Sequence, residues 1–193
     1  MSREEAIACV VDSIPKEAIV VATTGRAVRE LYAVREFRAE GHENDFHNVG
    51  AMGHASQIAL GVALSRPDRL VVCLDGDAAI IMHMGTLAIN GTTSPSNLLH
   101  VVLNNGAHES VGGQSSAARS INLTNIAHSC GYATVGNPVA TLEQIVNAVR
   151  KLIASDKPGF LDVLIRQGIR SDLGPLAVTP ADTRARFLQG GRQ

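Results

Sequence analysis

The sequence predicts an α/β fold: a doubly wound parallel sheet with helices on both faces. Two observations predict this fold. Short apolar runs, of the length of strands buried on both faces, alternate with longer segments whose apolar residues recur at helical spacing. Glycine or polar residues, which end regular structure, separate the two kinds of segment. Strand and helix in alternation is the pattern of a parallel sheet that is covered on both sides.

Five apolar runs are the expected strands. They are residues 19–23, 70–74, 98–103, 160–165 and, less regular than the others, 132–135. The runs are short and rich in valine, isoleucine and leucine, and they lack the polar alternation of a strand with one solvated face. We therefore expect all of them in the middle layer of the fold.

Six segments are expected to be helical. Two of them begin with a capping box, in which a hydroxyl residue and an acidic or amide residue three positions later cap each other's backbone: Ser2 with Glu5, and Thr141 with Gln144. The other four are residues 26–37, 53–64, 79–90 and 123–130. The segment 53–64 consists mostly of small residues, so it is suited to pack closely against another surface.

The remaining segments are expected to be irregular. Residues 39–48 are polar, and residues 106–120 are rich in glycine, serine and alanine, which is typical of a functional loop. Residues 170–193 form a polar C-terminal tail, part of which we expect a partner to order. No repeat or linker interrupts the chain, and 193 residues suit one core, so a single domain over residues 1–193 is expected.

Composition and charge exclude several functional classes. The net charge of −1 and the absence of tryptophan argue against binding to nucleic acid or to an anionic membrane. No apolar run approaches the length of a membrane span, and the N-terminus carries acids where a signal peptide carries bases. The three cysteines are far apart and are expected to be reduced thiols, which indicates a cytoplasmic protein.

Polar residues follow two neighbouring strands at 75–79 and 104–107. Ligands of parallel sheets bind beyond the carboxyl ends of the strands, where Asp77 and Asn105 are expected to lie close together. Carboxylate, carboxamide and carbonyl oxygens suit Mg²⁺, and small residues at a helix start leave N–H groups open to phosphate. These residues predict a magnesium-bridged diphosphate site. The alternative is that Asp77 and Asn105 are ordinary turn and cap residues.

The motifs at these positions resemble those of thiamine diphosphate enzymes. Gly76-Asp77 and Asn104-Asn105 are similar to that family's GDG signature followed, after a gap, by NN, and the segment GAMGH at 50–54 resembles its upstream G-S-M-G-H segment. GHASQIALGVAL, RLVVCLDGDAAIIMHMGTLA and VVLNNGAHESVGGQ look specifically like phosphonopyruvate decarboxylases, and less like sulfopyruvate decarboxylases. The resemblance runs from about residue 19 to residue 174 and implies the diphosphate-binding domain of the thiamine diphosphate-binding fold.

The resemblance implies cofactor-binding and metal-binding roles. Asp77 and Asn105 would give side-chain oxygens to Mg²⁺, and Ala107 its backbone carbonyl. The residues that would contact thiamine diphosphate are Gly25, Gly50, Met52, Gly53, Gly76, Asp77, Ala78, Ala79, Asn105 and Ala107. Ala78 replaces the last glycine of GDG. That change costs about 1 kcal/mol if the position requires a positive φ and is harmless if only a small side chain is needed. We expect it to be harmless, since Ala79 is also small.

Three residues near these motifs are the candidate catalytic residues: His108, Glu109 and His54. His108 and Glu109 directly follow the metal-binding motif and suit proton transfer or substrate contact. The alternative for His108 is a hydrogen bond within its own loop. Gln114, Arg26 and Arg170 are weaker candidates for contact with an anionic substrate, and for the two arginines the alternative is a solvated surface charge.

The resemblance also implies a partner. Thiamine diphosphate enzymes need a glutamate from a separate pyrimidine-binding domain, and no segment of this chain resembles that domain. A pyrimidine-binding α subunit that supplies the glutamate is therefore expected, in a hetero-oligomer such as α2β2. Met52 and the helix 53–64 are its expected contact surface.

Three hypotheses of function follow. The first is the β subunit of a thiamine diphosphate- and Mg²⁺-dependent decarboxylase that converts phosphonopyruvate, a small anionic 2-oxo acid, to phosphonoacetaldehyde and CO2. The second is a sulfopyruvate decarboxylase β subunit or another thiamine-dependent keto-acid lyase. The third, from another class, is a non-catalytic binding module on a flavodoxin-like sheet, which predicts no Mg²⁺-dependent binding of thiamine diphosphate.

Overall fold

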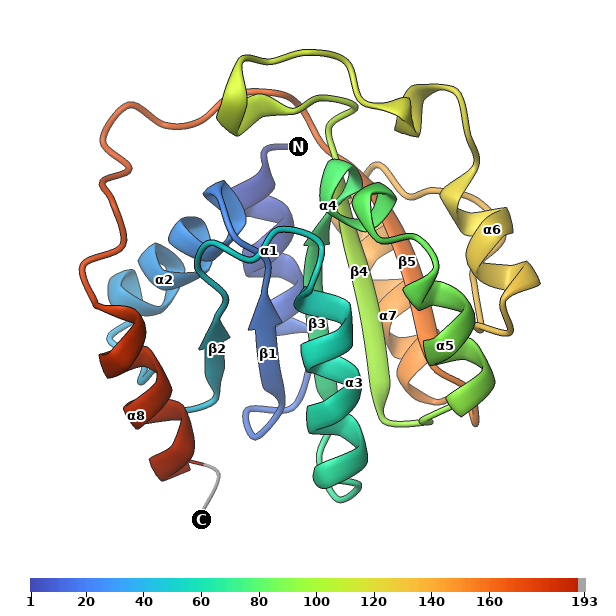
Figure 1. The fold of residues 1–193 in the computed structure, drawn as a ribbon, viewed down its shortest axis with the longest axis horizontal. Helices are drawn as coiled ribbons and strands as arrows, with labels where there is room; N and C mark the ends of the chain where they lie inside the picture. The colour runs from blue at the N-terminus through green and yellow to red at the C-terminus, as the bar shows by residue number, and fades with distance from the viewer. Residues whose placement is uncertain (191–193) are drawn as a thin grey trace.

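The computed structural model describes residues 1–190 and contains one sheet of five parallel strands in the order β2-β1-β3-β4-β5 (Figure 1). The strands are β1 (Ile19–Ala22), β2 (Asp45–His47), β3 (Val71–Gly76), β4 (Leu98–Asn104) and β5 (Gly159–Leu164). The strand order reverses between β1 and β3. In an open α/β sheet, this switch point opens a crevice at the carboxyl ends of the strands, where ligands bind.

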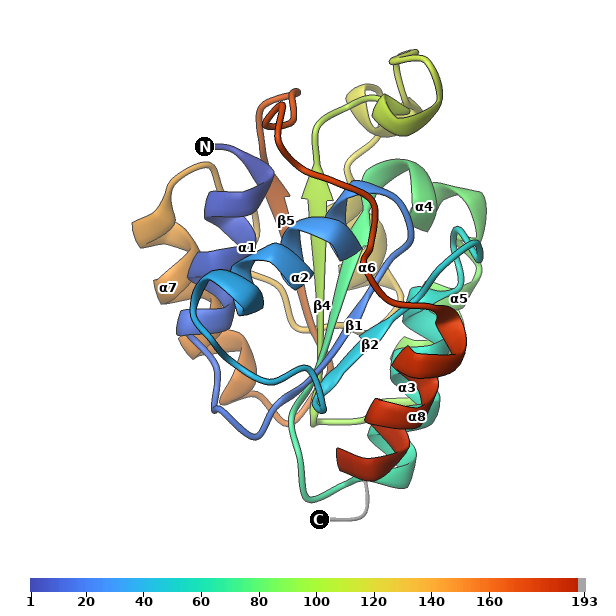
Figure 2. The ribbon, with the colours of Figure 1, turned by 90° about the vertical axis from the view of Figure 1, so that its left-hand side faces the viewer.

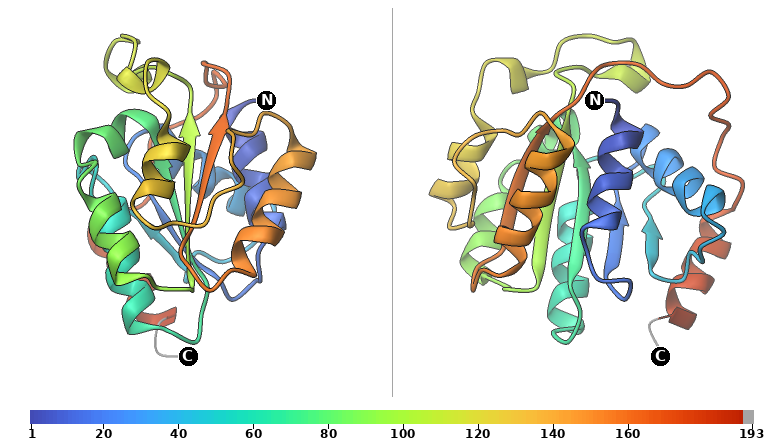
Figure 3. Two further views of the ribbon diagram at one scale, coloured as in Figure 1. Left: turned by 90° about the vertical axis from the view of Figure 1, so that its right-hand side faces the viewer. Right: turned by 180° about the vertical axis from the view of Figure 1, so that it is seen from behind.

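Helices cover both faces of the sheet, as the sequence predicts (Figure 2). One face carries α1 (Arg3–Asp12), α2 (Arg26–Phe37) and α7 (Leu142–Ile153). The other carries α3 (Ala55–Ser65), α4 (Asp77–Met82), α5 (Thr86–Thr93), α6 (Leu123–Ser129) and α8 (Pro180–Gly190) (Figure 3). No helix within residues 1–190 has both the length and the apolar character that crossing a bilayer demands.

Alternate strand residues supply the two sides of the core. Val72 of β3 packs on the side of α1 and α7, and its neighbours Val71 and Cys73 pack against α3. All three side chains are fully buried. Burial of an aliphatic side chain of this size contributes about 1.5–3 kcal/mol, so the sheet anchors the strand ends that carry the polar motifs.

Most elements match the sequence-based prediction. Both capping boxes are present, at Ser2 with Glu5 and at Thr141 with Gln144. Four of the expected strands form within a residue or two of their predicted bounds. The prediction of a strand at 132–135 is wrong, because only Ala133 forms a β-bridge there, an isolated parallel one to Gly159.

The prediction of a loop over residues 39–48 is wrong in part, because β2 lies within it. Asp45 and His47 are buried although they are polar, and Arg35 of α2 donates hydrogen bonds to both carboxylate oxygens of Asp45, at 3.0 and 3.1 Å. Phe46, between them, packs on the opposite side against Phe187 of α8. A strand whose buried side chains are polar gives no apolar signal in the sequence.

The single helix expected over residues 79–90 is two helices, α4 and α5, which are separated at His83–Gly85. The His83 ring packs beside Gly53, where an added Cβ would lie 2.4 Å from its Cδ2 atom, and its centroid is 4.5 Å from that of His54. The chain leaves helical geometry at His83, with φ −132° and ψ 44°. The break therefore coincides with the contact between this segment and the residues that precede α3.

Part of the C-terminal tail packs on the chain's own sheet, because Pro180–Gly190 form helix α8, which the sequence-based prediction did not include. This helix lies along β2, and the Phe187 and Phe46 rings meet edge to face with centroids 5.2 Å apart. Thr179 caps its start, since the Thr179 hydroxyl accepts a hydrogen bond from the Asp182 backbone N–H and donates one to the Asp182 carboxylate. The sequence Thr-Pro-Ala-Asp carries this capping signal.

Candidate active site

The predicted site residues meet in a cleft of about 250 Å³ at the carboxyl ends of β1, β3 and β4. Ten of them line it: Gly25, Met52, Gly76, Asp77, Ala78, Ala79, Asn105, Ala107, His108 and Glu109. Gly50, Gly53 and His54 lie outside this lining, in the segment that leads into α3. The yellow-green segment 106–120 passes above the ends of the strands (Figure 1).

Asp77 begins α4 directly after β3, and it is buried. The Ser116 hydroxyl donates a hydrogen bond to its Oδ2 atom. Burial raises the pKa of Asp77, and this hydrogen bond together with the backbone N–H groups of Ala78 and Asn105 partly opposes the shift. Ionisation of a buried carboxyl group is costly when the group stands alone, but it becomes favourable when a cation is bound beside it.

The two asparagines after β4 serve different purposes. Asn104 is buried, and its amide donates to the Asp162 carboxylate on β5 at 3.4 Å while its Oδ1 atom accepts from the Gly106 N–H at 3.1 Å. Asn105 lines the cleft, where its Oδ1 atom accepts from the Ala107 N–H at 3.0 Å. Of this pair, Asn105 therefore offers an amide oxygen to a ligand in the cleft.

Two glycines of the predicted site, Gly50 and Gly76, leave space beside the backbone, whereas Gly25 and Gly53 do not. A Cβ added at Gly50 or Gly76 would meet no atom within 4 Å. Gly25, where α2 begins, has φ +102°, and a Cβ there would lie 3.1 Å from the Ser110 hydroxyl oxygen. The Gly50 N–H donates to the Thr24 hydroxyl at 3.0 Å, which joins the loop before α3 to the end of β1.

Ala78, which departs from the GDG signature, has no backbone strain. Within residues 1–190 the positive-φ residues other than glycine are Ala39 and Ser94, and Ala78 lies inside α4 with a right-handed backbone. The position therefore has no conformational need for glycine.

The three candidate catalytic residues have different surroundings. Glu109 is bound by Arg3, by Arg26 at 3.2 Å, by the Asn105 amide at 3.0 Å and by the Gly168 N–H. Burial opposes ionisation of Glu109, but the Gly168 N–H and the two arginines outweigh it and lower its pKa.

His108 is half-buried in the cleft, and its backbone N–H donates to the Gln114 carbonyl at 2.8 Å, which closes the loop. His54 is exposed, and its Nδ1 atom lies 3.1 Å from the Met52 carbonyl oxygen. The two histidines are thus on different segments, and His108 is the one that lines the cleft.

The weaker candidates also differ in position. Arg26 lines the cleft and is paired with Glu109. Arg170 lies outside the cleft lining and pairs with Glu4 at 3.0 Å. The Gln114 side chain is exposed and lies beside Gly112.

Several residues of the site were missed by the sequence-based prediction. Thr23, Ser110 and Arg3 line the cleft, and Ser116 binds Asp77. Thr23 follows β1 directly, so its place at a strand's carboxyl end could have identified it. Arg3 in the first turn of α1 has the sequence signature of a surface charge, and only the fold brings it to the cleft.

The residues present fit magnesium and a diphosphate. Asp77, Asn105 and the Ala107 carbonyl are hard oxygen donors on adjacent strand ends, as Mg²⁺ prefers. The start of α4 and the open backbone at Gly76 offer N–H groups to phosphate oxygens. The cleft is smaller than the ~300–1,000 Å³ of pockets that enclose a whole ligand. This chain therefore suits one part of such a ligand.

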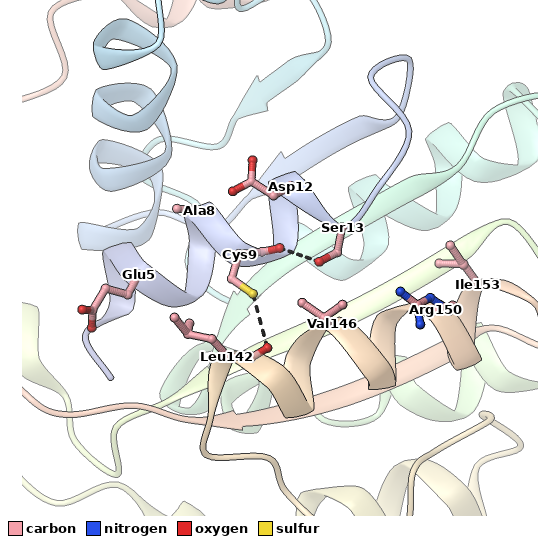
Figure 4. Close-up of a pocket in the computed structure, with 9 residues that line it drawn as sticks. All are labelled: Glu5, Ala8, Cys9, Asp12, Ser13, Leu142, Val146, Arg150 and Ile153. Carbon is pink, nitrogen blue, oxygen red and sulfur yellow. Dashed lines mark hydrogen bonds between the residues drawn. The ribbon is translucent and has the colours of Figure 1, made fainter.

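A second cleft, of about 700 Å³, lies between α1 and α7 (Figure 4). The Cys9 thiol donates to the Leu142 carbonyl at 3.5 Å, and the Ser13 hydroxyl donates to the Cys9 carbonyl at 2.7 Å. The second bond lies at the end of α1, and the first joins α1 to α7, so both belong to helix packing. Burial raises the pKa of Cys9, which makes its thiol less reactive. This cleft is larger than the one at the strand ends but lacks its convergent polar groups.

Two further groups of buried side chains bring potential metal-ligand atoms together. They are His42, Asp45 and His47 on the side of β2, and Cys73, Asp75 and His100, of which Asp75 also lines the cleft directly before Gly76. Arg35 occupies both carboxylate oxygens of Asp45. The Asp75 carboxylate accepts from the Gly76 N–H at 2.9 Å and lies 3.3 Å from His100 Nε2. Both acids are therefore already engaged in holding the fold.

Comparison with known proteins identifies the family. The model of the thiamine pyrophosphate enzyme C-terminal TPP-binding domain matches residues 23–163. The chain is 40% identical over 174 residues to phosphonopyruvate decarboxylase of Streptomyces viridochromogenes, covering 90% of this chain and 42% of the relative. It is 32% identical over 190 residues to sulfopyruvate decarboxylase subunit beta of Methanocaldococcus jannaschii, covering 97% of this chain and 95% of the relative.

The chain thus spans less than half of one relative and nearly all of the other. Among solved structures, a putative thiamin diphosphate-dependent enzyme from Mycobacterium smegmatis superposes with a TM-score of 0.70 at 18% identity, over 87% of this chain and 32% of that one. That likeness supports the fold. The family match over residues 23–163 shows that the chain belongs to the thiamine pyrophosphate enzymes and carries their C-terminal TPP-binding domain.

Proposed function

We propose that this chain is the β subunit of a thiamine diphosphate- and Mg²⁺-dependent 2-oxo acid decarboxylase, completed by a separate pyrimidine-binding subunit. The observation that carries the proposal is the convergence of Asp77, Asn105 and Ala107 with the open start of α4 at the switch point of the sheet. The relatives named as decarboxylases support the reaction type.

The chain's own residues would hold the cofactor's charged end. Asp77, Asn105 and the Ala107 carbonyl would hold Mg²⁺, while backbone N–H groups at Gly25 and at Gly76 to Ala79 would bind the diphosphate. Gly50 and Gly53 flank Met52, and these three residues would contact the rest of the cofactor. Thiamine diphosphate, when bound, supplies the electron-accepting ring that lets a 2-oxo acid lose CO2.

The histidines near this end of the sheet are the candidates for proton transfer. His108 lines the cleft and is half-buried, so it is the first candidate to transfer the proton that product release requires. His54 lies on the segment before α3 and is the second candidate. Glu109 lines the same cleft, but it is occupied by two arginines and two N–H donors.

The size of the site and the relatives support a partner subunit. A cleft of about 250 Å³ suits part of a ligand, which favours a second surface that encloses the rest. One relative that this chain matches over 95% of its length is named as a beta subunit. We place the activating glutamate on a pyrimidine-binding α subunit, with an α2β2 hetero-oligomer as the assembly and the surface around Met52 and α3 as the contact.

The substrate is a small anionic 2-oxo acid, and phosphonopyruvate is the first candidate, giving phosphonoacetaldehyde and CO2. Two observations support an anion: Arg26, whose side chain is 24% exposed, lines the cleft, and the identity to phosphonopyruvate decarboxylase is 40%. Sulfopyruvate is the second candidate, because the relative that this chain matches at nearly full length is a sulfopyruvate decarboxylase subunit.

Release of CO2 from each keto acid tests the proposal. The chain is assayed with thiamine diphosphate and Mg²⁺, alone and co-expressed with a pyrimidine-binding subunit, and Asp77→Asn in the same assembly is the control. We expect CO2 release in the assembly, little with the chain alone, and loss in Asp77→Asn. The preferred substrate decides between phosphonate and sulfonate. An assembly that binds the cofactor but decarboxylates neither acid contradicts the assigned reaction.

A further inference from the structure

Glu109 is the centre of a connected set of ion pairs at the edge of the cleft. Its carboxylate accepts from Arg3, from the Gly168 N–H, and from the Asn105 amide at 3.0 Å, and it lies 3.2 Å from Arg26 Nη1. These four groups come from α1, from the segment after β5, from the end of β4 and from α2. The Glu109 side chain thus connects three other parts of the fold to Asn105, the residue that follows β4.

Arg3 is the buried cation of this set, and it binds both Glu30 and Glu109. Its side chain is 7% exposed, its Nη1 atom donates to Glu30 of α2 at 3.1 Å, and its Nη2 atom donates to Glu109. The Glu30 side chain is 3% exposed. A buried arginine held between two carboxylates has little freedom to move, because losing either partner would leave a buried charge unpaired. Arg26, at 24% exposed, is the looser of the two cations.

Asn105 is held from both sides. Its Nδ2 atom donates to Glu109 Oε2 at 3.0 Å, and its Oδ1 atom accepts from the Ala107 N–H at 3.0 Å. A carboxylate paired with arginines accepts hydrogen bonds and donates none, so it can bind only the NH2 side of an amide. The Glu109 contact therefore decides which side of the Asn105 amide faces away from the arginines. A metal ion accepts the oxygen of an amide and is repelled by its NH2 group.

We propose that Glu109 is a positioning residue that fixes the Asn105 amide with its oxygen toward the metal, and that buried Arg3, braced by Glu30, holds Glu109 in place. The inference rests on the proposed function, in which Asn105 is a ligand of Mg²⁺. Residues that orient metal ligands through a hydrogen bond change metal affinity about 10- to 100-fold when they are replaced.

Glu109→Gln is the most direct variant. Glutamine keeps the size of the side chain, but its own NH2 group can donate to the Asn105 oxygen and so hold the amide in the wrong orientation. Asp45→Asn is the matched control, because it is the same carboxylate-to-amide change at another buried carboxylate that an arginine binds, on β2. Both variants lose a buried ion pair, and only the first contacts a proposed metal ligand.

Calorimetry on the assembly of this chain with its pyrimidine-binding subunit separates the loss of an ion pair from the loss of the contact with Asn105. Mg²⁺ is titrated in the presence of thiamine diphosphate, and thiamine diphosphate is titrated at saturating Mg²⁺. For Glu109→Gln we expect the Mg²⁺ dissociation constant to rise about 10- to 100-fold, with a much smaller change in cofactor affinity at saturating Mg²⁺. For Asp45→Asn we expect a lower melting temperature and Mg²⁺ affinity within twofold of the parent.

Arg3→Lys keeps the test informative if Glu109→Gln fails to fold. Lysine retains the positive charge, but a single ammonium cannot replace the two separate nitrogens that bind Glu30 and Glu109. We expect an intermediate loss of Mg²⁺ affinity. Mg²⁺ affinity unchanged in both variants would overturn the positioning role while leaving the proposed function intact. An unsubstituted assembly that binds thiamine diphosphate equally well without Mg²⁺ would overturn the proposed metal site, and the positioning role with it.

Discussion

The Ser116 hydroxyl donates a hydrogen bond to the carboxylate of Asp77, which lies 39 residues earlier in the chain. Both residues are buried. Asp77 begins α4 at the end of β3, and Ser116 belongs to the loop that follows β4, so this bond fastens the loop over the candidate site. The orientation of the proposed metal ligand therefore depends on a residue that is distant in sequence.

Ser116→Ala is expected to weaken Mg²⁺ binding about tenfold, because an orienting partner of a metal ligand is lost. The measurement is the Mg²⁺ concentration that gives half-maximal binding of thiamine diphosphate in the assembly. Ser115→Ala, at the exposed neighbouring residue, is the control and should leave that concentration unchanged. An equal effect of the two substitutions would show that the loop, and not the hydrogen bond, governs the site.

Ala78→Gly restores the GDG signature, and we expect it to leave cofactor affinity within about twofold of the parent. The backbone at this position is already right-handed, so glycine relieves no strain. A glycine inside a helix costs about 0.5–1 kcal/mol, so the free energy of unfolding should fall by that amount. Urea unfolding and calorimetry check both expectations. Markedly tighter cofactor binding by the glycine variant would mean that alanine distorts the site.

Glu30→Gln should change how stability depends on pH. Burial raises the pKa of Glu30 from 4.5 to about 7, which the attraction of Arg3 opposes. Between these values the folded protein holds a proton that the unfolded chain has lost. The contribution of Glu30 is therefore fully present below pH 4.5 and is lost as the pH rises through about 7.

Urea unfolding at a series of pH values tests this prediction. The parent should lose at most about 1.4 kcal/mol per pH unit to this group between its two pKa values, and Glu30→Gln should show a flatter dependence. Glu143→Gln, at an exposed residue of α7, should keep the slope of the parent. Parallel curves for the parent and Glu30→Gln would contradict the raised pKa.

Two helical glycines offer a matched test of packing. A Cβ at Gly91 of α5 would lie 1.8 Å from the Cys130 carbonyl oxygen, whereas a Cβ at Gly61 of α3 would meet nothing within 4 Å. Gly91→Ala should destabilise the fold by about 1–3 kcal/mol through overpacking. Gly61→Ala should stabilise it by up to about 1 kcal/mol through helix propensity. Thermal unfolding distinguishes the two, and similar melting temperatures would refute the close contact between α5 and α6.

The sequence was sufficient to predict the part of the site that lies at strand ends. Asp77 and Asn105 could be found because buried parallel strands are strongly apolar and the residues just after them are confined to one edge. Ser116 could not, because its position depends on the path of an irregular loop. Arg3 could not, because an arginine in the first turn of a helix has the same local signature whether it is solvated or buried.

The missed elements have a similar cause. The pattern of β2 is misleading because Asp45 and His47 are the buried side chains, and ion pairing with Arg35 takes the place of apolar packing. Helix α8 is mostly exposed, and its packing on β2 rests largely on Phe187. Both elements depend on a specific contact between side chains, which the spacing of apolar residues cannot reveal.

We propose that Asp77 helps this chain to hold thiamine diphosphate through Mg²⁺. Calorimetric titration of thiamine diphosphate into the assembly, with and without Mg²⁺, measures this contribution. Asp77→Asn is compared with Asp156→Asn, which alters an exposed carboxylate. We predict Mg²⁺-dependent binding in the parent and in Asp156→Asn, and at least tenfold weaker binding in Asp77→Asn. Binding that is independent of Mg²⁺, or undiminished in Asp77→Asn, would contradict the claim.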